Sequence, residues 1–155
     1  MTLDHQYSFV IISDSTSSRQ LATLDLKDIQ NNTLDSSAIG RLNNPVWKKF
    51  LSNVDVNNIP NQKLTKSFDN NKKIRFVSEV KDFYQQRANS SPKRKYKNAY
   101  GTFIFSPVVF SEDGNKAVCT LHIFQGPEAA STTVFFLEKD KDDWNIYTRI
   151  LSSIS

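Results

Sequence analysis

A change to a two-residue period after Tyr100 constrains this chain more than any other feature of its sequence. Four β-rich segments follow one another there, "GTFIFSPVVF", "KAVCTLHIF", "STTVFFLEK" and "WNIYTRI", and the stretches between them have the composition of turns. Consecutive strands joined by short turns pair in antiparallel fashion. The sequence therefore predicts a four-stranded antiparallel meander over about residues 101–150.

Two short amphipathic helices are predicted upstream of the meander, over about residues 45–55 and 78–87. Asn44 and Ser78 are good N-cap residues, and Pro45 suits a first helical position because its missing N–H would have no partner there. An extra N-terminal strand is predicted in "YSFVIISD". These elements predict an α+β fold in which the helices cover one face of the sheet. The predicted inward residues are Trp47, Phe50, Leu51, Phe83, Cys119, Leu121, Ile123, Trp144 and Ile146.

Chain length and composition are consistent with one domain over residues 1–155. The chain has 155 residues, and aromatic residues make up 12% of them, which supplies large apolar side chains for a core. Its four glycines and five prolines are too few for a low-complexity chain. No apolar run is long enough to span a bilayer.

The N-terminus bears on localisation. "MTLDHQYSFVIISD" lacks the basic start and the small-residue cleavage site of a signal peptide. Two locations stay open, a cytoplasmic protein and the mature part of a periplasmic or membrane-anchored one.

The single cysteine and a nearby histidine are the first candidates for catalysis. Cys119 and His122 lie three residues apart, so an extended strand places their side chains on opposite faces of the sheet. They cannot act as nucleophile and base together. The only other imidazole, His5, is distant in sequence. The sequence does not show which of the scattered carboxylates converge, and it predicts no catalytic residue, no metal site and no cofactor.

A basic run is the best candidate contact for an anionic partner. The net charge of +4 is concentrated in "SPKRKYKNAY", which contains Lys93, Arg94, Lys95 and Lys97 around Tyr96. Lysines beside a tyrosine can hold phosphates while the ring stacks on a base. Nucleic acid is therefore an alternative partner.

The second half of the chain resembles a family of small, mostly uncharacterised bacterial proteins, often exported or lipid-anchored, with the pattern S-x-x-x-F-S-x-D-G…L-x-K…W-x-I…S. The matching residues are Gly101, Ser106, Phe110, Asp113, Gly114, Ala117, Leu137, Glu138, Lys139, Trp144, Ile146 and Ser155. "QGPEAASTT" and "DKDD" depart from the glycine-rich pattern of the family. The resemblance implies an α+β fold around an antiparallel sheet and implies no catalytic residue.

The sequence is consistent with three functions. The first is a non-catalytic protein-binding module, for example an immunity-type inhibitor of a bacterial toxin, because the chain is small and lacks catalytic motifs. The second is an anion- or nucleic-acid-binding domain that uses residues 93–97. The third is a small-molecule-binding α+β domain with a pocket under the sheet. The sequence does not indicate the oligomeric state.

Overall fold

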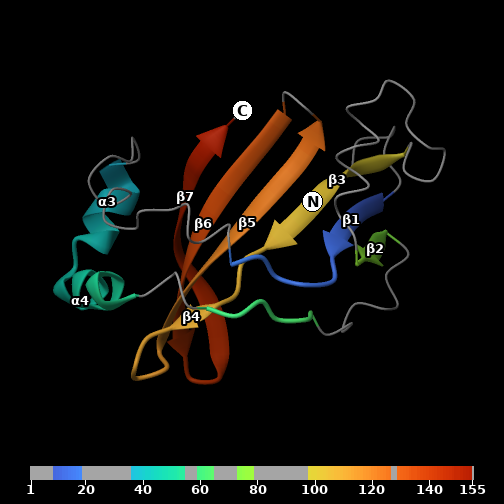
Figure 1. The fold of residues 1–155 in the computed structure, drawn as a ribbon. Coiled ribbons are helices and arrows are strands. Elements are labelled where there is room, and N and C mark those ends of the chain that lie inside the picture. The colour runs from blue at the N-terminus through green and yellow to red at the C-terminus, as the bar shows by residue number, and fades with distance from the viewer. Residues whose placement is uncertain are drawn as a thin grey trace.

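A seven-stranded sheet dominates the computed structural model, which describes residues 9–18, 36–54, 59–64, 73–78, 98–126 and 129–154 (Figure 1). The strands are β1 (Phe9–Ser13), β2 (Ile74–Val77), β3 (Ala99–Phe105), β4 (Val109–Phe110), β5 (Lys116–Gly126), β6 (Ala129–Asp140) and β7 (Asp143–Ile154). Their order is β2-β1-β3-β5-β6-β7, and the short β4 pairs with β5. The described helices are α3 (Ser36–Leu42) and α4 (Pro45–Asn53).

The prediction of a four-stranded antiparallel meander in an α+β fold is wrong. The sheet is mixed, because β1 runs parallel to both β2 and β3 while the other pairs are antiparallel. All five residues of β1 are buried, so this strand lies inside the sheet between two neighbours. Its partner β2 is more than sixty positions away in sequence, and periodicity alone reveals no pairing at that distance.

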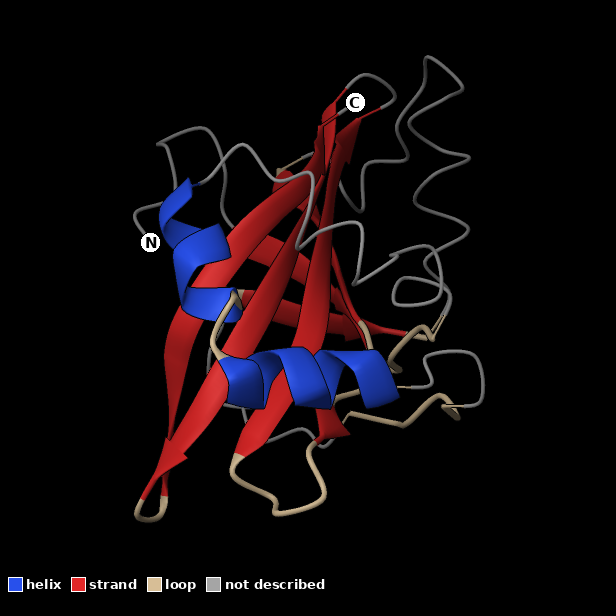
Figure 2. Ribbon diagram, turned by 90° about the vertical axis from the view of Figure 1, so that its left-hand side faces the viewer, coloured by secondary structure: helices blue, strands red, loops and turns tan. Residues whose placement is uncertain are grey.

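Helix α4 begins where the sequence predicts and packs on β5–β7 (Figure 2). The Asn44 side chain accepts a hydrogen bond of 2.9 Å from the Val46 N–H, which caps the first turn. Trp47 and Leu51 point into the core, where they join the cluster formed by Val118, Val134, Phe136 and Ile150. The predicted helix over 78–87 lies outside the described residues apart from Ser78.

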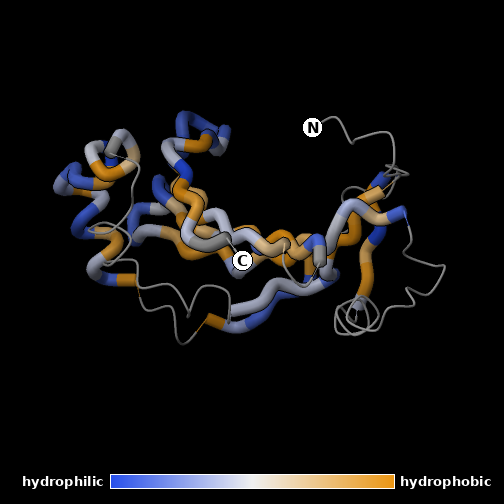
Figure 3. Tube along the Cα trace, turned by 90° about the horizontal axis from the view of Figure 1, so that it is seen from above, coloured by the Kyte–Doolittle hydropathy of each residue, from blue (hydrophilic) through white to orange (hydrophobic). Residues whose placement is uncertain are grey.

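Helix α3 was not predicted and contributes Ala38 and Leu42 to the same cluster. It lies beside the edge strand β7, where the Arg41 guanidinium donates a hydrogen bond of 2.7 Å to the Tyr147 carbonyl. Seen from above, both helices lie on one side of the sheet (Figure 3). We call this side the helix face and the other side the open face.

Several predicted inward residues lie on the open face instead. Trp144 is 39% exposed and Ile146 is 58% exposed. Leu121 and Ile123 join a second cluster that includes Phe103, Val10 and Ile12, away from the helices. Both faces of β5 carry apolar side chains, so alternation separates two sets of residues without showing which set the helices cover. Phe83 lies outside the described residues.

Three buried threonines, Thr102, Thr120 and Thr132, lie on the helix face of the central strands. Thr102 and Thr120 are fully buried, and neither hydroxyl has a hydrogen-bond partner. The hydroxyl of Thr132, by contrast, lies 2.9 Å from Nδ1 of His122. A buried hydroxyl without a partner lowers stability by about 1–3 kcal/mol relative to its hydrated state.

This difference predicts opposite effects for two matched substitutions. Thr120→Val removes an unpartnered hydroxyl and should raise the free energy of unfolding by about 1 kcal/mol, whereas Thr132→Val removes a partnered one and should lower it by about 1 kcal/mol. Urea unfolding followed by circular dichroism measures both. Equal changes in the same direction would show that strand propensity, which the two substitutions share, decides the outcome.

Candidate functional site

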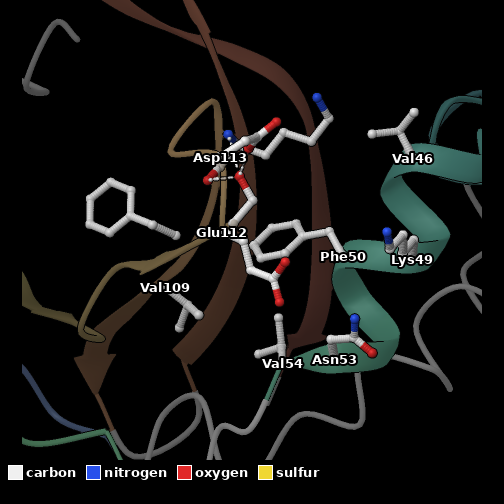
Figure 4. Close-up of a pocket in the computed structure, with 11 residues that line it drawn as sticks. Val46, Lys49, Phe50, Asn53, Val54, Val109, Glu112 and Asp113 are labelled. Carbon is white, nitrogen blue, oxygen red and sulfur yellow. Dashed lines mark hydrogen bonds between the residues drawn. The ribbon is translucent and has the colours of Figure 1, made fainter.

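A groove between α4 and the turn that joins β4 to β5 is the candidate site (Figure 4). Its volume is about 310 Å³, at the lower end of the range for small-ligand pockets. Its lining comes from one helix and one hairpin: Val46, Lys49, Phe50, Asn53, Val54, Val109, Phe110, Ser111, Glu112, Asp113 and Lys116.

The floor of the groove is apolar because of the spacing of residues on α4. Trp47 and Leu51 point into the core, while Phe50 and Val54 lie beside them and are only partly buried. The Phe50 ring packs against the Trp47 ring with 5.7 Å between centroids. From the sheet, Val109 pairs with Val118 and therefore faces the helices, where it completes the floor.

The opposite wall is a turn fixed by its own hydrogen bonds. The Ser111 hydroxyl donates to Oδ1 of Asp113 at 2.5 Å, and the Asn115 N–H donates to the same oxygen at 3.1 Å. The Lys116 N–H donates to the Ser111 hydroxyl oxygen at 2.9 Å. Gly114 has φ +68°, a left-handed conformation that glycine adopts without strain. These bonds lower the pKa of the Asp113 carboxyl, since they favour its charged form, with the Ser111 hydroxyl contributing most.

One charged residue of the lining, Lys116, forms an ion pair with Glu138 of β6. The Lys116 ammonium lies 3.5 Å from Oε1 of Glu138, and that oxygen accepts a hydrogen bond of 2.9 Å from the indole N–H of Trp47. The same ammonium lies 5.7 Å from the centroid of the Trp47 ring. Lys116 and Glu138 are thus already partnered.

The open face of the same hairpin exposes a row of large apolar side chains. Phe110 pairs with Ala117, Ala117 with Leu137, and Leu137 with Ile146, so one row crosses four strands. Phe110 is 56% exposed and its ring lies 5.6 Å from that of Trp144. We call the two aromatic residues Phe110 and Trp144, together with the neighbouring aliphatic residue Ile146, the aromatic row.

Cys119 and His122 lie on opposite faces of β5, as the alternation predicts. Cys119 pairs with Phe135 and His122 with Thr132, and the pairing is regular between them. Burial raises the pKa of the Cys119 thiol to about 11 and lowers the pKa of His122. Both shifts favour the neutral form of the side chain.

The basic candidates Lys93, Arg94, Lys95, Tyr96 and Lys97 lie outside the described residues, and so does His5. The groove was not predicted. The sequence feature that could have indicated the groove is the apolar stripe of α4. This stripe includes Phe50 and Val54 in addition to the two buried residues Trp47 and Leu51. Among the residues that the structure describes, no three acidic, histidine or cysteine side chains are grouped as a metal site would need. None of the described helices has the length and apolar character needed to cross a membrane.

Comparisons with known proteins found no match: no family model, no curated protein and no solved structure is similar to this chain. The resemblance in the second half of the sequence therefore stays a prediction.

Burial of Cys119 predicts that its thiol reacts slowly in the folded protein. With a pKa of about 11, compared with 9.0 for a free side chain, the native thiol should react about a hundredfold more slowly with a disulfide reagent at pH 8 than the urea-unfolded chain does. The native rate should also rise about tenfold per pH unit above pH 8, because only the thiolate reacts. Equal native and unfolded rates would contradict the burial of this side chain.

The turn predicts a pH-dependent contribution of Asp113 to stability. Its folded-state pKa lies below the ordinary 3.8, so the contribution is complete above that value and is lost as the pH falls through the folded-state pKa. Asp113→Asn should therefore lower the melting temperature at pH 7 and have a smaller effect near pH 3. Asp142→Asn, in the exposed β6–β7 turn, is the control. A pH-independent difference would show that the charge of Asp113 contributes nothing.

Proposed function

We propose that this chain is a non-catalytic protein-binding module that docks through the aromatic row. The observation that supports this proposal most directly is the exposure of Phe110, Trp144 and Ile146 together at one end of the open face, at 56%, 39% and 58%. Single exposed apolar residues are common on protein surfaces, but a contiguous group is characteristic of interaction sites.

The chemistry of the row is that of a binding hot spot. Tryptophan and other aromatic residues contribute most of the energy at many protein interfaces, because their rings bury a large area at a small cost in conformational entropy. The row lies on strands rather than on a loop, so its rings are held in fixed positions before any partner binds. Docking a preformed surface avoids the cost of ordering it.

Charges beside the row indicate what kind of partner would fit. Lys139 and Arg149 are exposed and share the open face with the row, by their pairing with Trp144 and Phe135. No carboxylate stands on this face among the described residues of β4–β7. A partner with an apolar patch bordered by acidic groups would complement it. A bacterial toxin bound by an immunity-type inhibitor is one example of such a partner.

The aromatic row can be tested by pairwise co-purification with the products of neighbouring genes. A Phe110→Ser/Trp144→Ser double variant should lose retention of a partner at least about thirtyfold, which corresponds to about 2 kcal/mol of hot-spot energy. Val46→Ser is the matched control, because Val46 is similarly exposed at 54% but lies on α4. Circular dichroism verifies that each variant is folded.

Two results would count against the proposal. Equal retention of a partner by the double variant would show that the row is not the docking surface. Absence of any partner among the neighbouring gene products would remove the support for a binding module.

A further inference from the structure

The groove on the helix face carries opposite charges on its two walls. Lys49 extends from α4 and Glu112 from the β4–β5 turn, and both side chains are exposed (Figure 4). Neither forms an ion pair with another described residue. Of the other two charged residues of the lining, Lys116 pairs with Glu138, and the Asp113 carboxylate accepts two hydrogen bonds within its own turn.

An apolar floor separates these two free charges. Phe50, Val54 and Val109 form this floor, and Figure 4 shows the Glu112 side chain extending beside the Phe50 ring. A molecule that fills the groove would therefore lie on an apolar surface between an ammonium on one side and a carboxylate on the other.

Both walls are rigid, which favours binding of a small molecule. The turn is held by the hydrogen bonds of Ser111, Asp113 and Asn115, and α4 is held by its Asn44 cap and by the burial of Trp47. A preformed site does not have to be ordered when its ligand arrives. A volume of about 310 Å³ accommodates a ligand the size of one amino acid.

We propose that the groove binds a zwitterion with an apolar body, namely a free α-amino acid with an aliphatic or aromatic side chain. Its carboxylate pairs with Lys49, its ammonium pairs with Glu112, and its side chain lies on the floor formed by Phe50, Val54 and Val109. Of the aromatic row, the groove lining includes Phe110 alone, and the residues that would contact the ligand lie outside the row. The proposal therefore does not depend on the protein-binding proposal.

The affinity expected for such an open site is weak. Two exposed ion pairs and one partly buried side chain give a dissociation constant on the order of 1 mM. Titration with L-leucine, followed by the amide resonances of Val54, Val109 and Asp113, is suited to this range. Each exposed ion pair should account for about a fivefold change in affinity.

Capped forms of leucine separate the two charges. N-acetyl-leucine lacks the ammonium and leucinamide lacks the carboxylate, so each should bind about fivefold more weakly than leucine. Lys49→Gln should weaken leucine about fivefold and leave leucinamide unchanged. Glu112→Gln should weaken leucine equally and leave N-acetyl-leucine unchanged. This pattern forms a double-mutant cycle between wall and ligand.

Matched controls lie outside the groove. Lys48→Gln removes one exposed positive charge, as Lys49→Gln does, and Asp142→Asn removes one exposed negative charge, as Glu112→Gln does. Both control variants should leave leucine binding unchanged. No resonance shift with 50 mM leucine would overturn the proposal. Equal binding of leucine and its capped forms would overturn it as well, and would identify the groove as an apolar slot for a side chain of a protein partner.

Discussion

The packing of Trp47 against the sheet is the interaction on which the groove depends. Its ring contacts Phe136 edge-on and stacks on Tyr147 at 5.4 Å with an interplanar angle of 18°. Its indole N–H donates a hydrogen bond to Glu138, so burying this ring leaves no unpartnered polar group on Trp47 itself. Loss of a buried tryptophan of this kind typically costs about 3–5 kcal/mol. Without it, α4 would have no fixed position and the groove would lack one wall.

Apolar residues on both faces of the central strands explain how two separate surfaces arise on one hairpin. On the helix face, Val118, Val134 and Phe136 are covered by α3 and α4. On the open face, Leu121 and Ile123 pack with Phe103, but the hairpin end of this face is uncovered. The neighbouring residues Val109 and Phe110 show the consequence, because alternation places Val109 in the groove and Phe110 in the aromatic row.

The sequence correctly predicted features that depend only on neighbouring residues, namely the start of α4 and the alternation of side chains between the two faces of β5. The Asn44 cap and Pro45 located the start of α4 correctly, because capping depends on neighbouring residues only. Alternation placed Cys119 and His122 on opposite faces for the same reason. Non-local pairing was not predictable in this way: nothing in "FVIIS" indicates that it lies between β2 and β3. The exposure of Trp144 and Ile146 depended on which face the helices cover, and alternation does not contain that information.

The candidate site was not predicted because it depends both on a local pattern, the apolar face of α4, and on a non-local contact, the position of the β4–β5 turn opposite that face. The sequence predicts Trp47, Phe50 and Leu51 as core residues of α4, yet of these only Trp47 and Leu51 are buried. The remaining apolar side chains of α4 become a binding floor only because the β4–β5 turn lies opposite them, and that turn was interpreted as a polar connection. Its hydrogen bonds explain why it can form a wall: the Ser111 hydroxyl and the Asn115 N–H both donate to the Asp113 carboxylate, which fixes the backbone that carries Glu112 at the groove. A stretch that looks like an ordinary acidic turn in the sequence can thus form the side of a binding site when an apolar helix faces it.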